Sequence, residues 1–183
     1  MRGKEEKTMK VLLVIDIQND FIDGALGTKE AKKIVPYVKK KIEEYKENSE
    51  PVIFTRDTHS KDYLSTQEGR NLPVEHCIEN TKGWDITSQI DPGEYLIFNK
   101  PTFGSVKLAQ YLKEHYSEAS FELVGLCTDI CVISNAMLIK AYLPENEVVV
   151  DALGCAGVTV ESHKNALAAM KLCQIQILHD DME

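Results

Sequence analysis

The sequence lacks the features that mark membrane, secreted and nucleic-acid-binding proteins. No hydrophobic run reaches the roughly 20 residues that a membrane-spanning helix needs, and the opening stretch MRGKEEKTMK has no apolar segment typical of a signal peptide. Basic residues form no large cluster, and a net charge of −8 opposes nucleic acid as the main partner. The five cysteines are scattered and odd in number, which excludes a disulfide framework and favours a reducing, cytoplasmic setting.

The composition is that of an ordinary globular protein. The chain has 183 residues, of which 43% are hydrophobic and 27% are charged, and this is enough to bury a sizeable core in one domain. We expect residues 1–8 to form an N-terminal extension and residues 9–183 to form that single domain.

Apolar segments alternate with helical patterns along the chain. Strands are predicted at residues 10–17, 51–57, 94–100, 121–126, 147–153 and 174–178, and helices at 29–46, 104–116, 131–142 and 161–173. Strands that are apolar throughout and separated by helices indicate a parallel sheet covered on both faces. The sequence therefore predicts an α/β fold with three α-β-α layers and a mostly parallel sheet of about six strands. Residues 58–93 are too long for an ordinary connection, which is typical of a functional loop.

Charged and thiol side chains follow the first four predicted strands. Asp16, Asp57 and Lys100 end the first three strands, and the fourth runs into Cys127 and Cys131. Open parallel sheets bind ligands beyond the carboxyl ends of their strands. We therefore expect these side chains to share one crevice.

Such a set allows acyl transfer through a thioester. A helix N-terminus and the Lys100 ammonium favour a thiolate at Cys131, and Asp16 can accept the thiol proton. The backbone amides of Cys127 and Cys131 can hold the oxyanion formed on attack at a carbonyl, and Asp129 is expected to cap the helix. The alternative is that the charges are solvated strand ends and the cysteines are small core residues.

A second group of side chains has the composition of a metal site. Asp57 and His59 follow the second strand, and Glu68 and His76 lie further along the long loop. Two imidazoles with one or two carboxylates suit zinc, with manganese or iron as alternatives. The spacing matches no tight metal-binding motif, so polar loop residues without a ligand remain the alternative.

Three segments resemble the motifs of the isochorismatase-like cysteine hydrolases, and within them the nicotinamidases. These are VIDIQNDFIDGAL, FNKPTFGS and VGLCTDICV, in the order of the family, together with RDTH and HC in the metal-binding segment. The resemblance implies a catalytic Asp16, Lys100 and Cys131, a cis peptide bond between Leu126 and Cys127, and an oxyanion hole formed by the amides of Cys127 and Cys131. It also implies a divalent metal ion, zinc first, on Asp57, His59, Glu68 and His76, and a homo-oligomer acting on a small amide such as nicotinamide.

One part of the resemblance is incomplete. Nicotinamidases carry an aromatic residue shortly before the histidine of HC that stacks on the pyridine ring, whereas this chain has Leu72, Pro73 and Val74 there. Phe21 matches the other aromatic wall of the pocket, and Trp84 is the further candidate, with a loop anchor as its alternative role. A ring stack contributes roughly 0.5–1.5 kcal/mol, so the departure bears on substrate choice more than on the class of reaction.

Two rival functions stand beside amide hydrolysis of the nicotinamidase kind. The first is a hydrolase of the same superfamily that acts on an N-carbamoyl compound or another small amide without metal. The second is a thiol redox or sensor protein that uses Cys127 and Cys131 as a switch. Retention of a stoichiometric metal would oppose the first, and a dependence of the chemistry on Lys100 would oppose the second.

Overall fold

The computed structural model of the protein describes residues 8–180, so the predicted extension at residues 1–8 lies, except for Thr8, outside the described residues. The strands are β1 (Lys10–Ile15), β2 (Val52–Asp57), β3 (Leu96–Lys100), β4 (Ser120–Leu126), β5 (Val148–Ala156) and β6 (Gln176–Leu178). The helices are α1 (Asn19–Ile22), α2 (Lys29–Glu47), α3 (Gln67–Asn71), α4 (Val106–His115), α5 (Ile133–Tyr142) and α6 (Val160–Leu172). Within these residues no helix has the length and apolar character needed to cross a membrane.

The six strands form one parallel sheet in the order β3-β2-β1-β4-β5-β6. The chain builds outward from β1 to β3 and then returns to the other side of β1 with β4. Strand order therefore reverses between β1 and β4, where an open parallel sheet leaves a crevice beyond its carboxyl ends. Asp16 follows β1 and Cys127 follows β4, so both border this crevice.

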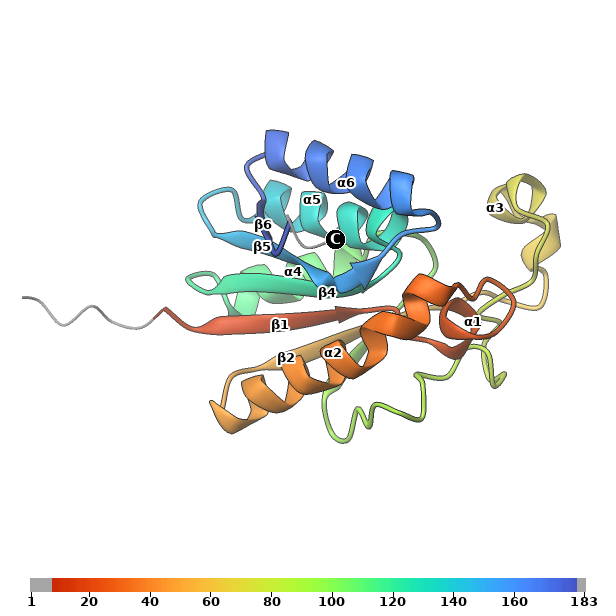
Figure 1. Ribbon diagram of the computed structural model, residues 1–183, viewed down its shortest axis with the longest axis horizontal. Helices are drawn as coiled ribbons and strands as arrows, with labels where there is room; N and C mark the ends of the chain where they lie inside the picture. The colour runs from red at the N-terminus through yellow and green to blue at the C-terminus, as the bar shows by residue number, and fades with distance from the viewer. Residues whose placement is uncertain (1–7, 181–183) are drawn as a thin grey trace, which may run out of the picture.

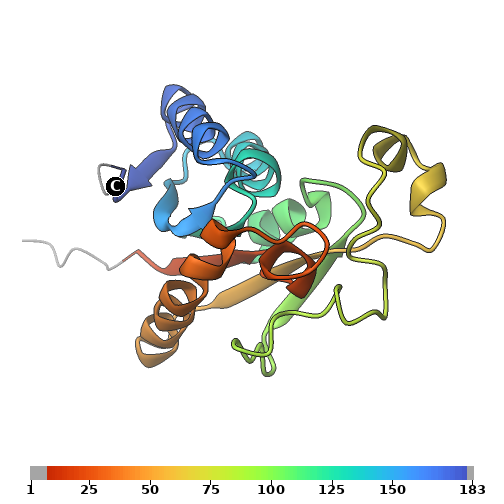
Figure 2. The ribbon, with the colours of Figure 1, turned by 45° about the vertical axis from the view of Figure 1, so that its right-hand side comes forward.

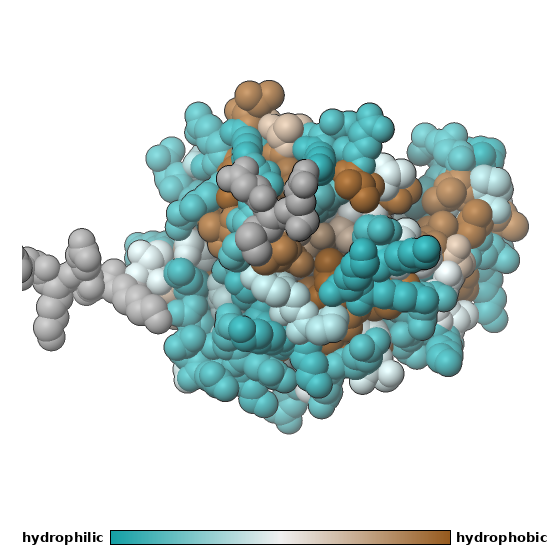
Figure 3. Space-filling view, in the orientation of Figure 1, coloured by the Kyte–Doolittle hydropathy of each residue, from teal (hydrophilic) through white to brown (hydrophobic). Residues whose placement is uncertain are grey.

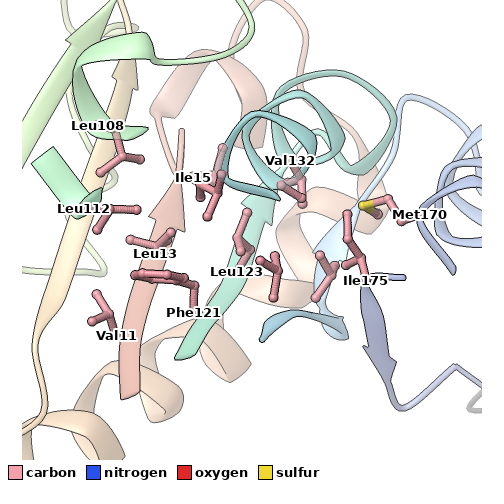
Figure 4. Close-up of a cluster of buried hydrophobic side chains, with 14 of the residues drawn as sticks. Val11, Leu13, Ile15, Leu108, Leu112, Phe121, Leu123, Val132, Met170 and Ile175 are labelled. Carbon is pink, nitrogen blue, oxygen red and sulfur yellow. The ribbon is translucent and has the colours of Figure 1, made fainter. Parts of the chain in front are cut away.

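Helices cover both faces of the sheet and bury two separate cores (Figure 1). Alternate residues of β1 point to opposite faces: Leu13 belongs to the core that includes residues of α4, α5 and α6, and Leu12 belongs to the core that includes residues of α2. Figure 4 shows the first of these cores, with Leu13 beside Phe121 and Leu123. The three-layer α-β-α architecture predicted from the sequence is thus confirmed.

The long helix α2 shows how local sequence sets an element of these layers. The Thr28 side chain accepts a hydrogen bond from the Ala31 amide at 3.0 Å and so caps the start of the helix. Ile34, Val38 and Ile42 then face the sheet at spacings of four residues. The outer side of the helix is charged, and Figure 3 shows a largely hydrophilic surface over it.

Close packing at the strand reversal requires a glycine. Gly125 pairs with Ile15 across β4 and β1 and has φ +123°. A Cβ atom on this residue would lie 2.0 Å from the Ile15 carbonyl oxygen, so only glycine allows the two strands to approach here. The contact lies at the end of β4, immediately before the segment that carries Cys127 and Cys131.

The long connection between β2 and β3 extends past the carboxyl ends of the strands. It contains the 3₁₀ turn Tyr63–Ser65 and the short helix α3, which stand apart from the three layers (Figures 1 and 2). The exposed side chains of Leu64 and Leu72 lie on this excursion. The part of the connection from α3 to His76 borders the crevice, and Ile90 near its end packs in the core on the α2 side of the sheet.

Candidate active site

Lys100 joins the side chains at the carboxyl ends of β1 and β3. Its Nζ atom lies 2.6 Å from Oδ2 of Asp16 and 3.4 Å from Sγ of Cys131. It also donates to the Thr102 carbonyl oxygen at 3.1 Å and lies 3.3 Å from Oδ1 of Asp57. The structure thus brings together the lysine, the carboxylate and the thiol that the strand ends predicted, and all three are buried.

The backbone turns Asp16 into this position. Its φ angle is +46°, in the left-handed region, where a non-glycine residue needs support from its surroundings. Thr55 on β2 supplies that support: its hydroxyl accepts from the Asp16 amide at 3.2 Å and donates to Oδ1 at 2.7 Å. One carboxylate oxygen is therefore held by Thr55 and the other faces Lys100.

Cys131 lies in a turn of π-helical form, Thr128–Val132, that leads directly into α5. The Leu126–Cys127 peptide bond before this turn is cis, which confirms the bond implied by the family motif. The amides of Ile130 and Val132 donate to the Cys127 carbonyl oxygen at 3.1 and 3.0 Å and close the turn. The thiol is therefore carried at the start of a helix, as predicted.

Two contacts tie this turn to the start of α6. The hydroxyl of Thr128 lies 2.7 Å from Nδ1 of His163. The Asp129 carboxylate accepts a hydrogen bond from the Val158 amide at 3.1 Å, so the prediction that Asp129 caps its own helix is wrong. Because Val158 lies in the loop between β5 and α6, the aspartate holds two segments together instead.

Asp16, Lys100 and Cys131 form a triad, and burial and neighbouring charges both shift the pKa values of its members. Burial, together with the nearby Asp16 carboxylate, holds the pKa of the Cys131 thiol well above its usual range. Burial also raises the pKa of Asp16, against the lowering effect of Lys100. For Lys100 burial acts to lower the pKa, but the charges of Asp16, Cys131 and Asp57 outweigh it and raise the value. Burial thus opposes ionisation of both Asp16 and Cys131, and Lys100 acts against that effect at each of them.

A second cluster, made of side chains that can bind a metal ion, lies next to the triad. Atoms of Asp57, His59 and His76 lie within 4.8 Å of one another, and all three residues are buried. Oδ2 of Asp57 lies 2.9 Å from Nε2 of His59 and 3.7 Å from Nε2 of His76. Oε1 of Glu68 lies 3.7 and 3.9 Å from the same two nitrogens. The four predicted ligands therefore converge.

The donor atoms of this cluster have the arrangement that a divalent ion needs. Ligands about 2.0–2.2 Å from a tetrahedral zinc ion lie roughly 3.3–3.6 Å apart, close to most of the separations found here. Nδ1 of His76 lies 2.8 Å from the Val74 carbonyl oxygen, and this contact leaves Nε2 as the ligand atom. The side chains present can hold a divalent metal ion.

Gln18 holds the end of β2, which carries Asp57, beside the crevice. Its side chain accepts from the Asp57 amide at 2.7 Å and donates to the Asp57 and Trp84 carbonyl oxygens at 2.9 and 2.8 Å. The residue is fully buried. Sequence reasoning did not single it out, although it lies two residues after Asp16 within VIDIQNDFIDGAL.

A cavity of about 370 Å³ opens onto both clusters, a size typical of a small-molecule site. Its polar lining comes from Thr102, from the thiols of Cys127 and Cys131, from three of the four candidate metal ligands and from two side-chain amides of α3. Its apolar lining comes from five side chains. The lining residues are Phe21, Leu26, Asp57, Gln67, Glu68, Asn71, Leu72, His76, Thr102, Phe103, Cys127, Ile130 and Cys131. Phe21 is thus on the cavity as expected, and its ring centroid lies 5.6 Å from that of His76.

Trp84 does not line this cavity. Its Nε1 donates to the Thr58 hydroxyl at 2.8 Å, and its ring centroid lies 3.4 Å from the guanidinium carbon of Arg56. The indole is buried between these residues, as its alternative role of loop anchor requires. Phe103, which sequence reasoning did not assign, lies on the cavity instead.

Comparison with known proteins identifies the family. The isochorismatase domain family matches residues 10–181. A nicotinamidase of Schizosaccharomyces pombe is 24% identical, with 92% of each chain covered. A pyrazinamidase of Pyrococcus horikoshii in complex with zinc has 29% identity and a TM-score of 0.81, covering 92% of this chain and 98% of its own.

A nicotinamidase/pyrazinamidase of Bacillus subtilis is similar to the same extent, with 27% identity and a TM-score of 0.80 over 93% of this chain and all of its own. The family match spans nearly the whole described structure. It therefore includes both the triad and the four candidate metal ligands. The chain belongs to the isochorismatase family.

Proposed function

We propose that the protein hydrolyses nicotinamide, or a closely related small aromatic amide, to the carboxylic acid and ammonia through a thioester on Cys131. The observation that carries this proposal is the placement of the Lys100 ammonium against both the Cys131 sulfur and the Asp16 carboxylate. The nicotinamidase and pyrazinamidase relatives support the choice of an aromatic amide.

The first half of the reaction forms the thioester. Asp16 takes the thiol proton while the Cys131 sulfur attacks the amide carbonyl carbon, and Lys100 stabilises the negative charge on the sulfur. The oxyanion is held by the backbone amides of Cys127 and Cys131. The C–N bond then breaks, Asp16 gives its proton to the leaving nitrogen, and ammonia departs.

The second half regenerates the enzyme. Asp16 takes a proton from water as the water oxygen attacks the thioester carbonyl carbon, and the same two amides hold the second oxyanion. The carbon–sulfur bond breaks, Asp16 returns the proton to the sulfur, and the acid leaves. The net change is one amide and one water converted to one acid and one ammonia.

Asp57, His59, Glu68 and His76 are proposed to hold a divalent ion, with zinc first and manganese or iron as alternatives. The zinc complex of the Pyrococcus relative and the convergence of four donor atoms support this assignment. A bound ion would supply a Lewis acid for a pyridine ring nitrogen of the substrate. The homo-oligomeric state and the cytoplasmic setting stay predictions.

Ammonia release from nicotinamide by the purified protein tests the proposal directly, with Cys131→Ala and a chelator-treated sample alongside. Turnover that is lost in the variant supports the thiol mechanism, and turnover that is also lost on chelation supports the role of the metal. Wild-type turnover by Cys131→Ala would overturn the assignment of the nucleophile.

A further inference from the structure

Phe103 is a large apolar residue with no place in either hydrophobic core. Its side chain is 42% exposed, and among the described residues it packs into neither of the two core clusters. It does line the cavity that contains Cys131 and Phe21. Its ring is thus positioned to contact whatever fills that cavity rather than to stabilise the fold.

The segment that carries Phe103 is anchored to the side chains of the active site. Lys100 donates to the Thr102 carbonyl oxygen at 3.1 Å. Beyond it, the buried amide of Asn135 donates to the Phe103 carbonyl oxygen at 3.1 Å and accepts from the Ser105 amide at 2.9 Å. The backbone on both sides of Phe103 is therefore fixed, although its side chain is exposed.

Asn135 ties the same segment to the turn of the nucleophile. Its Nδ2 atom also donates to the Cys131 carbonyl oxygen, at 2.8 Å. One side chain on α5 thus joins the backbone of Phe103 to that of Cys131. These hydrogen bonds fix the backbone of Phe103 relative to the backbone of the residue that carries the reacting sulfur.

We propose that Phe103 is a substrate-contacting residue that selects amides attached to a flat aromatic ring. It supplies a phenyl ring in addition to that of Phe21 in a cavity that Leu72 also lines. Offset or edge-to-face contact between rings is favourable, and the apolar Leu26 and Ile130 of the same lining accept a planar ring equally well. This inference rests on the proposed amide hydrolysis.

The test compares Phe103→Ala and Val106→Ala by steady-state ammonia release from nicotinamide. Val106 is the matched control because it lies three residues away, is 51% exposed and does not line the cavity. We expect Phe103→Ala to raise KM about 10-fold with kcat within about 3-fold, as loss of a ring contact predicts. Val106→Ala should stay within about 2-fold of wild type.

Thermal unfolding of each variant separates a loss of contact from a loss of fold. A folded Phe103→Ala variant whose KM matches that of Val106→Ala would overturn the inference while leaving amide hydrolysis intact. A wild-type protein that releases no ammonia from nicotinamide would instead overturn the proposed substrate. Butyramide, which has no ring, provides the contrast: its kcat/KM should be unchanged by Phe103→Ala, and an equal loss for both amides would contradict ring selection.

Discussion

The ammonium of Lys100 lies 2.6 Å from a carboxylate oxygen of Asp16, with both side chains buried. The two residues end strands that are not neighbours, since β2 separates β1 from β3. Each ion is thus stabilised by the other in a place where water is scarce. The thiol of Cys131 contacts this pair, so a proton transfer from sulfur to Asp16 creates a thiolate beside a fixed positive charge.

Replacing Cys131 by Ala should lower the rate of ammonia release by at least about 10³-fold, because it removes the thiol that Lys100 contacts beside Asp16. Removal of one sulfur atom from a buried turn should cost only about 1 kcal/mol of unfolding free energy. Cys173→Ser is the control, since Cys173 is exposed. Steady-state kinetics and urea unfolding of the same samples check both expectations.

The Cys127→Ala variant distinguishes hydrolysis from a redox switch. Burial raises the pKa of Cys127 to about 12, and the Lys100 ammonium that can stabilise a thiolate contacts Cys131 instead. Because the backbone amide is unchanged in the variant, we expect most of the turnover to remain. A requirement for both thiols, together with a change in free thiol content on mild reduction, would favour the redox alternative.

Replacing Asp16 by Asn should lower kcat by about 10²–10⁴-fold with little change in KM, since the variant keeps the shape of the side chain and loses the proton acceptor. Lys100 retains Asp57 and the Thr102 carbonyl oxygen as partners, so the protein should fold. Asp151→Asn is the matched control, because Asp151 is equally buried but lies outside the active site. A kcat equal to that of the control would exclude Asp16 as the base.

Loss of a metal ligand should be visible in metal content as well as in turnover. His76→Ala removes one of two imidazoles from the cluster and should weaken metal binding by more than about 100-fold. His115→Ala is the control, because His115 lies on α4 away from the cluster. Elemental analysis after dialysis should find about one metal ion per wild-type or control chain and little in the variant. Full turnover after complete metal removal would favour the metal-independent alternative.

The sequence predicted the sheet, its two covered faces and the residues at its strand ends, because each depends on local apolar pattern and on chain order. Apart from Phe21, it did not predict the apolar walls of the cavity. Trp84 lies against Arg56 and Thr58, while Phe103 reaches the cavity from a short turn after β3. Neither placement follows from periodicity, since both segments are irregular and their conformations depend on tertiary hydrogen bonds.

Other contributors to the site were missed for a related reason. Gln18 and Asn135 act through hydrogen bonds to backbone atoms distant in sequence, and His163 contacts Thr128 from another helix. A helical histidine is by default a solvated one, so His163 carried no signal of its own. Only the folded chain shows that α6 supports the turn of the nucleophile.

The last prediction concerns a buried charge cluster between α2 and β5 that is separate from the active site. Asp151 is fully buried and accepts hydrogen bonds from Lys41 and Tyr37, both at 2.8 Å, with Nδ1 of His179 at 2.9 Å. Burial acts to raise the pKa of Asp151, but the contacts with Lys41, His179 and Tyr37 outweigh it and lower the value below 3.8. A carboxylate with a lowered pKa in the folded state stabilises the protein above its unfolded-state pKa of about 3.9 and loses that contribution as the pH falls through the folded-state value.

Replacing Asp151 by Asn should therefore lower the free energy of unfolding by roughly 1.5–3 kcal/mol at pH 7, and the difference from wild type should shrink between about pH 5 and pH 3. Glu43→Gln, an exposed change of the same charge on α2, should stay within about 0.5 kcal/mol of wild type throughout. Urea unfolding at pH 7, 5, 4 and 3 measures all three proteins. A difference between Asp151→Asn and wild type that stays constant over this range would mean that the ionised carboxylate is not the source of the stabilisation.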